Sequence, residues 1–326
     1  MNSSKDPGSG RGLLHSHGDN LTDAQKLTRG LTVGVSAYLI WGSFPLIISM
    51  LGFASPFEII SWRIIFGFLT GIALLLITRT FKSVIEVFKN RNNLIWVSAS
   101  AILIFINWSI YVVAVASHQV VEASLGYFIN PLLTILLAVF FLNEKLGRAQ
   151  WVAVGFGLIA VVVLSFDYGR LPWIALSLAT SFGVYGLAKN KLGGKVKALT
   201  SFTVESGFVV PLAIAQLILV DLIGGGLMFA SQGVVGSAGL VAYGLLTAIP
   251  LILFGTAAQY VPLRFIGFMQ YISPILQFLV GILYFNEPMP AARWFGFVLV
   301  WCGLTVLIFD AVRGTRNQIV TKRESQ

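Results

Sequence analysis

The stretch VEASLGYFINPLLTILLAVFF, residues 121–141, carries a single charged side chain, Glu122, in an otherwise largely apolar run. A helix needs about 20 mostly apolar residues to cross the hydrocarbon core of a bilayer, so this stretch predicts a transmembrane helix. Similar stretches lie on both sides of it along the chain, and most are separated by short loops. We therefore predict an all-α polytopic membrane protein with ten transmembrane helices. The predicted spans are 31–50, 57–77, 95–114, 121–141, 149–166, 172–188, 200–220, 238–257, 264–284 and 293–309.

The composition of the whole chain supports this fold class. Hydrophobic residues make up 56% of the 326 residues and charged residues 11%, with a mean hydropathy of +0.85. Soluble domains carry about 25% charged residues, which excludes a soluble globule. The 25 Phe, 8 Trp and 9 Tyr residues exclude disorder for most of the chain, because aromatic side chains require burial. The single cysteine, Cys302, excludes a disulfide framework.

The two ends of the chain are polar. Residues 1–28 contain no apolar run, so we expect a disordered cytoplasmic tail rather than a signal peptide. Residues 311–326 predict a cytoplasmic C-terminal tail. With both termini inside, every Lys and Arg outside the spans except Arg170 and Arg293 falls on the cytoplasmic side. The net charge of +9 is thus a topology signal that suits an anionic lipid leaflet, and it requires no nucleic-acid partner.

The chain contains an internal repeat. A shift of 143 residues aligns 123–167 with 266–310. The matched pairs include Pro131/Pro274, Asn143/Asn286, Glu144/Glu287, Trp151/Trp294 and Asp167/Asp310. Residues 29–167 therefore predict a first repeat of five spans, and residues 168–310 a second. Because five is odd, the second repeat enters the membrane from the opposite face, which is the inverted-topology plan of many secondary transporters.

Each repeat carries a polar stripe on its fourth span. The residues of the stripes are Tyr127, Asn130 and Thr134 in the first repeat, and Gln270, Ser273 and Gln277 in the second. Their spacing places each set on one helical face. Pro131 and Pro274 lie about 15 Å into their spans, where a proline leaves the carbonyl four residues earlier without its helical partner. We expect a polar cavity at mid-membrane; the alternative is a kinked helix repaired by its neighbours.

Further aromatic and amide side chains fall at the same depth on other spans. A wall of Trp and Tyr with scattered amides is typical of a site for an amphipathic or aromatic small molecule. The candidate substrate-binding residues are Trp41, Asn107, Trp108, Tyr111, Tyr127, Asn130, Tyr185, Gln270 and Tyr271.

Ionisable side chains inside a membrane are rare and often functional. Arg63 lies about two turns into its span from the outside, and Glu122 is at similar depth, so we expect an outer ion pair between them. The repeat relates Arg63 to Glu205, which predicts an inner pair of Glu205 with Arg264. These pairs could be gates that open alternately; alternatively, Arg63 is a structural anchor and Arg264 an interfacial arginine. Glu58, Glu122 or Glu205 could also carry a coupled proton, because desolvation favours the neutral carboxyl.

The string EASLGYFINP, residues 122–131, resembles the RarD family within the EamA group of the drug/metabolite transporter superfamily. Further resemblances are AYLIWG (37–42), Glu58-x4-Arg63, Asn107-Trp108, SFGVYG (181–186) and GFMQYISP (267–274). The resemblance covers nearly the whole membrane part. It implies a ten-helix inverted-repeat transporter in the bacterial cytoplasmic membrane. Family members are named for chloramphenicol sensitivity or resistance, and relatives export amino acids, metabolites or drugs. Arg264 and the long polar N-terminus depart from the family pattern.

Other functional classes find little support. The chain contains no G-x-x-x-x-G-K-[ST] motif, so we expect no nucleotide-driven pump. Neither His118 nor Cys302 has a partner suited to catalysis or metal binding, so we expect no enzyme, no metal and no cofactor. A secondary carrier is the favoured function, and a non-transporting membrane receptor or scaffold is the alternative.

Small residues on the fifth and tenth spans predict a close helix contact. They are Ala153, Gly157, Gly296 and Gly303. Such residues let helix backbones approach closely, either within the bundle or across a dimer. We favour packing within the bundle and expect a monomer or a homodimer.

Overall fold

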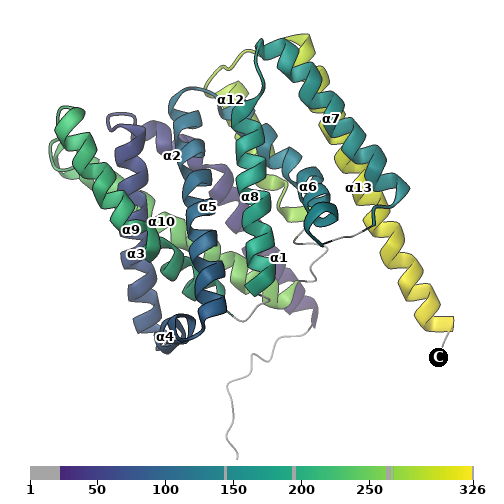
Figure 1. Ribbon diagram of the computed structural model, residues 1–326, viewed down its shortest axis with the longest axis horizontal. Coiled ribbons are helices and arrows are strands. Elements are labelled where there is room, and N and C mark those ends of the chain that lie inside the picture. The colour runs from purple at the N-terminus through teal and green to yellow at the C-terminus, as the bar shows by residue number, and fades with distance from the viewer. Residues whose placement is uncertain (1–22, 143–144, 193–195, 262–265, 267, 325–326) are drawn as a thin grey trace, which may run out of the picture.

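The computed structural model describes residues 23–142, 145–192, 196–261, 266 and 268–324, and every regular element in these ranges is a helix. The helices run roughly side by side between two faces of the bundle (Figure 1). We call the face where α2 ends and α3 begins the upper face, and the face where α4 lies the lower face. The helices are α1 Asp23–Gly42, α2 Phe44–Met50, α3 Pro56–Ile77, α4 Lys82–Lys89, α5 Arg91–Ala116, α6 Val120–Leu142, α7 Arg148–Tyr168, α8 Trp173–Leu192, α9 Ala198–Ile223, α10 Gly233–Tyr260, α12 Ile272–Leu283 and α13 Ala291–Glu324.

Eight segments in the described ranges are long and apolar enough to cross a membrane. They account for eight of the ten predicted spans, with α1 and α2 counted as one segment from Gln25 to Met50. The predicted span 172–188 lies largely within α8, and the predicted span 264–284 contains α12; neither helix is among the eight segments. The 12 residues of α12 extend only about 18 Å, less than the hydrocarbon thickness.

Local sequence explains where several helices begin. The Ser55 hydroxyl accepts a hydrogen bond from the Glu58 backbone N–H and caps α3, with Pro56 as the first helical residue.

Pro131 lies inside α6, as predicted. Pro274, however, lies in the first turn of α12 rather than in the middle of a helix. The prediction that Pro274 interrupts a continuous helix is therefore wrong: a proline is tolerated in a first turn because the N–H groups there have no intrahelical acceptor.

Helices far apart in the sequence pack against one another. The closest pairs include α7 with α13, α3 with α9, α6 with α8, α1 with α12, α5 with α8, α1 with α10, α3 with α10, and α5 with α9. The α7–α13 pair forms one edge of the bundle (Figure 1).

Small residues hold α7 and α13 together. A Cβ atom added to Gly303 would lie 3.0 Å from the Ala153 carbonyl oxygen, and one on Gly296 would lie 2.5 Å from Leu164. Gly157 likewise meets Leu132 of α6. These contacts confirm the packing role predicted for the small residues, because only glycine lets the neighbours approach so closely.

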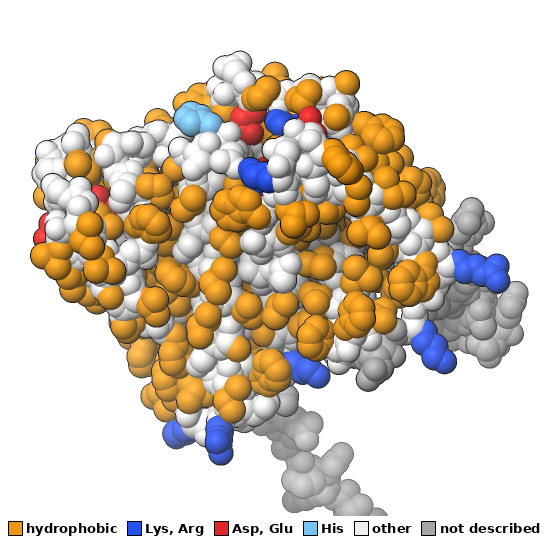
Figure 2. All heavy atoms as spheres, turned by 45° about the horizontal axis from the view of Figure 1, so that its top comes forward, with side chains coloured by type: hydrophobic (Ala, Val, Ile, Leu, Met, Phe, Trp, Pro, Cys, Tyr) orange, Lys and Arg blue, Asp and Glu red, His pale blue; other side chains and the backbone are white. Residues whose placement is uncertain are grey.

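The surface has the character of a membrane protein. Hydrophobic side chains cover the sides of the bundle, Lys and Arg gather mainly along the lower edge, and the visible acidic side chains lie toward the upper part (Figure 2). Many large apolar residues are exposed on these sides, including Phe140, Phe166 and Ile223. Apolar exposure on this scale requires a lipid environment.

Candidate functional site

Arg63 of α3 lies in a cage of uncharged side chains. Its side chain is buried, with 4% of the residue exposed. The guanidinium donates from Nε to Thr247 Oγ1 (3.1 Å) and from Nη1 to the Tyr243 hydroxyl (3.2 Å). Its Cζ atom lies 4.3 Å from the ring centroid of Trp108 and 5.4 Å from that of Phe44. We call these five residues the Arg63 cage.

The predicted ion pair between Arg63 and Glu122 is wrong. Glu122 accepts a hydrogen bond from Arg170 Nη2 (2.8 Å) and another from the backbone N–H of Ile174 (3.0 Å). The α8 N-terminus packs beside the start of α6, so its amide groups and the preceding arginine reach the carboxylate first. Sequence depth alone had not revealed Arg170 as the partner.

Glu58 anchors a loop from the other half of the chain. Its carboxylate accepts hydrogen bonds from the backbone N–H groups of Met228 (3.0 Å) and Phe229 (2.8 Å). Trp62 Nε1 also donates to it (3.3 Å). These bonds tie the segment before α10 to the first turns of α3.

The structure brings several predicted binding residues together beside the cage. Asn107 of α5 donates from Nδ2 to the Leu178 carbonyl (3.1 Å) and to Ser181 Oγ (3.0 Å) of α8. The Tyr127 hydroxyl of α6 donates to Asn107 Oδ1 (3.3 Å). One amide therefore links α5, α6 and α8.

An aromatic wall passes this amide, from Tyr111 on its upper side to Tyr185 on its lower side. The rings of Tyr111 and Tyr127 lie 5.9 Å apart, those of Tyr127 and Phe182 6.1 Å, and those of Phe182 and Tyr185 5.8 Å. Phe182 keeps 37% of its surface exposed although it contacts rings of α6 and α8.

Three predicted polar residues have buried atoms without a protein hydrogen-bond partner among the residues described. They are the Tyr111 hydroxyl, Asn130 Oδ1 and Gln277 Oε1. Buried polar atoms are nearly always hydrogen-bonded, so such atoms indicate a place for water or ligand.

Glu205 of α9 forms an ion pair with Lys189 of α8 near the lower face. Ser201 Oγ (2.9 Å) and the Tyr185 hydroxyl (3.4 Å) also donate to its carboxylate. The predicted partner, Arg264, lies outside the described residues. Lys189 was missed because the predicted span ended one residue before it, although it lies four residues from Tyr185 on the same helical face.

Three predicted residues, Trp41, Gln270 and Tyr271, lie in or next to α1 and α12. The Trp41 carbonyl accepts a hydrogen bond from Gln277 Nε2 (3.5 Å), and the Trp41 ring packs against Phe254. Gln270 is exposed, and Tyr271 directly precedes α12. These residues thus mark a second polar region, formed by α1 of the first half of the chain and α12 of the second.

A hollow of about 510 Å³ opens near the upper face, between the ends of α2, α3 and α5. Three buried aliphatic residues are part of its lining: Ile48, Ile59 and Val115. Each lies four residues, one helical turn of about 6 Å, nearer the upper face than Phe44, Arg63 or Tyr111, respectively. We call these three residues the upper plug, because they separate the hollow from the Arg63 cage.

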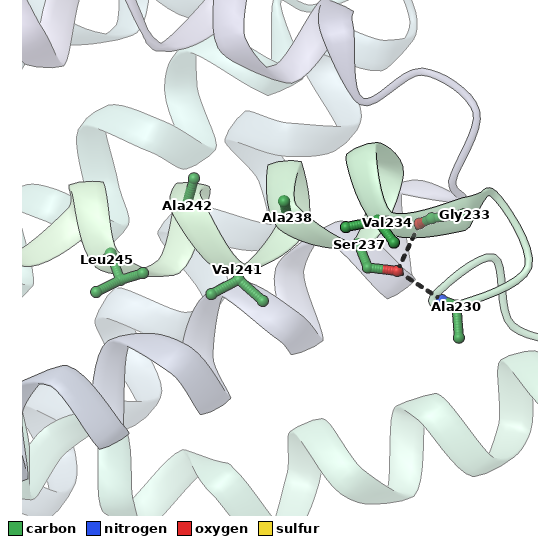
Figure 3. Close-up of a pocket in the computed structure, with 8 residues that line it drawn as sticks. All are labelled: Ala230, Gly233, Val234, Ser237, Ala238, Val241, Ala242 and Leu245. Atoms are coloured by element: carbon green, nitrogen blue, oxygen red, sulfur yellow. Dashed lines mark hydrogen bonds between the residues drawn. The ribbon is translucent and has the colours of Figure 1, made fainter.

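A second groove, of about 610 Å³, lies along α10 (Figure 3). Its lining residues are Ala230, Gly233, Val234, Ser237, Ala238, Val241, Ala242 and Leu245. They all come from one helix and the loop before it, and Ser237 bonds only to Ala230 N–H and Gly233 O. A shallow, mostly apolar groove on one helix is suited to lipid contact rather than to enclosing a solute.

Charged groups also meet across the upper face. Asp167 of α7 accepts a hydrogen bond from Arg293 Nε of α13 (2.9 Å), and the Arg293 guanidinium lies 4.3 Å from the Tyr168 ring centroid. Glu287 accepts from the backbone N–H of Val121 (3.0 Å) at the start of α6. Burial raises the pKa of the Glu287 carboxyl, against the lowering effect of these backbone bonds.

Nothing in the described ranges suggests a metal centre, since no three His, Cys, Asp or Glu side chains gather there. Cys302 is a free, exposed thiol.

Comparisons with known proteins point in one direction. Residues 28–166 match the family model described as the EamA-like transporter family. Protein RarD of Streptomyces exfoliatus is 43% identical over 289 residues, which cover 88% of this chain and 90% of that protein. Protein RarD of Escherichia coli strain K12 is 33% identical over 296 residues, covering 90% and 99%. An uncharacterized transporter of Bacillus subtilis, YojE, is 33% identical over 293 residues, covering 88% and 96%.

A solved crystal structure is similar in fold at 21% sequence identity. It superposes with a TM-score of 0.56 over 88% of this chain and 98% of that chain. At this identity the likeness concerns the fold alone.

Proposed function

The chain belongs to the RarD proteins of the EamA-like transporter family, and from this premise we propose that it is a secondary carrier for a small organic metabolite or drug. It works by alternating access in the bacterial cytoplasmic membrane, and export is the proposed direction. The observation that carries the proposal is the aromatic wall beside Asn107, together with the unpaired polar atoms of Tyr111 and Asn130. Such a lining offers ring faces and hydrogen bonds to a partly apolar solute.

The proposed architecture is a ten-helix bundle of two inverted repeats. In this arrangement α1, α3, α5, α6 and α7 correspond to α8, α9, α10, α12 and α13. The helix packing supports it, because exchanging the two sets converts α6–α8 into α12–α1, α5–α8 into α10–α1, and α3–α10 into α9–α5. The pairs α3–α9 and α7–α13 convert into themselves. A pseudo-symmetric bundle of this kind can exchange the roles of its halves during transport.

The proposed orientation places the lower face in the cytoplasm. Lys82 and Lys89 of α4, Arg91 of α5 and Arg148 of α7 lie at that face, as cytoplasmic basic residues should. Both termini are then cytoplasmic.

Two barriers would serve as gates. The upper plug of Ile48, Ile59 and Val115 closes the path from the outer hollow, and the pair of Lys189 with Glu205 crosses from α8 to α9 near the inner side. Opening them in turn would expose the aromatic wall to one side at a time. The same ion pair is where proton coupling would act, because a protonated Glu205 would release Lys189.

The deciding experiment combines binding and transport. Amino acids and aromatic drugs are screened for thermal stabilisation of the purified protein at two pH values, and each hit is followed as a radiolabelled solute in counterflow with proteoliposomes. We expect Tyr127→Leu to abolish both readouts, and Ser237→Ala, in the α10 groove, to leave both unchanged. Binding without movement across the bilayer would overturn the carrier and favour the receptor or scaffold alternative.

A further inference from the structure

The charge of Arg63 has no carboxylate partner among the residues that the structure describes. A guanidinium is permanently charged in proteins, and a buried charge normally requires an opposite charge. The three carboxylates that the sequence analysis placed inside the membrane all bind other groups. Glu58 binds backbone amides, Glu122 binds Arg170, and Glu205 binds Lys189.

The cage supplies only neutral contacts in place of a counter-charge. Thr247 and Tyr243 accept hydrogen bonds from Nε and Nη1, which accounts for two of the five N–H donors of a guanidinium. The Trp108 ring covers one side at 4.3 Å, an arrangement that attracts a cation through the ring quadrupole. Donors therefore remain, and they are of the type that binds a carboxylate through two parallel bonds.

The surroundings of these donors favour a particular kind of anion. The buried Tyr111 hydroxyl has no hydrogen-bond partner among the described residues, and Tyr111 lies three residues after Trp108 of the cage on α5, with its ring 5.9 Å from that of Tyr127. Tyr111 is the first ring of the aromatic wall, which continues through Tyr127 and Phe182 to Tyr185. An anionic head at Arg63 would therefore place an apolar body against tyrosine and phenylalanine rings.

We propose that Arg63 binds the carboxylate of the transported solute, so that the cargo is an organic anion with an aromatic or apolar body. This inference rests on the proposed carrier function and names its substrate class. The solute then supplies the opposite charge that the protein omits. The upper plug, one turn above the cage, holds the bound anion away from the outer hollow until α2, α3 and α5 separate.

The test compares acids with amides of the same shape. Benzoate, phenylacetate and indole-3-acetate are each paired with their primary amide, and binding to the wild-type protein is measured by calorimetry in phosphatidylcholine nanodiscs. This neutral lipid provides no anionic headgroup that could occupy Arg63 instead. We expect at least one acid to bind roughly tenfold or more tightly than its amide. Equal affinity in every pair, or no binding of any acid up to about 10 mM, would overturn the proposal.

Variants then locate the effect. Arg63→Gln should remove the preference for the acid, and Arg63→Lys should retain part of it, because a point charge replaces the bidentate fork. Arg91→Gln serves as the matched control, because Arg91 is exposed at the lower start of α5. If Arg63→Gln does not fold, the acid–amide comparison in the wild-type protein still decides the question.

Proteoliposomes distinguish this inference from the carrier function itself. If acids bind preferentially but no solute crosses the bilayer, the carrier function fails and the anion site stands. If neutral or cationic solutes cross and no acid is preferred, the carrier stands and the anion site fails.

Discussion

Arg63 and Glu205 are equivalent residues in the proposed repeat, and their charges have different surroundings. Each lies seven residues after the first residue of its helix, Pro56 of α3 or Ala198 of α9, near opposite faces of the bundle. Glu205 has an ion-pair partner in Lys189, whereas Arg63 has hydroxyl groups and aromatic rings. The charge of Glu205 is thus neutralised by a side chain of the protein, whereas the charge of Arg63 is the one that we propose a ligand neutralises.

The largest expected effect on stability comes from removing Lys189, the ion-pair partner of Glu205. Lys189→Met leaves the Glu205 carboxylate buried without its cation, which costs up to about 3 kcal/mol. The value lies at the low end for buried pairs because 28% of the Lys189 side chain is exposed. The measurement is the thermal midpoint of unfolding of the purified protein.

Two further variants complete that test. Adding Glu205→Gln to Lys189→Met should restore most of the lost stability, because no charge is then stranded. Lys191→Met, an exposed lysine two residues along α8, should leave the midpoint unchanged. A Lys189→Met protein as stable as the wild type would contradict the claim that Lys189 neutralises the buried Glu205 carboxylate.

Substitution of Arg63, which has no carboxylate partner among the described residues, should lower the stability less. Arg63→Gln removes two hydrogen bonds to neutral groups, at a cost of about 1–2 kcal/mol, and strands no carboxylate. The Thr247 hydroxyl keeps its bond to the Tyr243 carbonyl (3.0 Å). The same thermal measurement checks the order: a loss larger than that of Lys189→Met would mean that Arg63 is mainly a structural anchor.

The upper face offers a smaller version of the same comparison. Arg293 is 13% exposed in its pair with Asp167, whereas Arg170 is 39% exposed in its pair with Glu122. Solvent screens the second pair more strongly, so Arg293→Met should cost about 1–2 kcal/mol and Arg170→Met below about 1 kcal/mol. Thermal midpoints at low and high salt would report this, and an equal loss in both variants would contradict it.

Glu287 provides the smallest expected effect, a pH dependence. Burial raises its pKa above the ordinary value of 4.5, so the folded protein binds its proton more tightly than the unfolded chain does. Its contribution to stability is therefore full below pH 4.5 and is lost as the pH rises through the raised pKa. The thermal midpoint of Glu287→Gln, measured against pH, should lack this decline relative to the wild type. Parallel curves for the two proteins would show that Glu287 does not titrate in this range.

The sequence pointed to individual residues that the structure brings together, but it did not reveal their hydrogen-bond and ion-pair partners. The stripe spacing predicted Tyr127 and Asn130, and depth along the spans predicted Tyr185. Yet Glu122 binds Arg170 instead of Arg63, because depth in the membrane says nothing about which helix faces meet. Lys189 was assigned to a loop because hydropathy falls at Lys189 and Lys191, although α8 continues to Leu192.

The sequence by itself determined the membrane character, the helical fold class, most of the spans and the family, because hydropathy is a local sum over about 20 residues and motifs are contiguous. Only the tertiary structure decided that Pro274 begins a helix, that α3 packs on α9, and that Arg63 faces Trp108 and Thr247. A helix turns by about 100° per residue, so a small error in register or rotation changes every neighbour. Which side chains form pairs is therefore decided only in the assembled bundle, and there Arg63 has no carboxylate partner among the described residues.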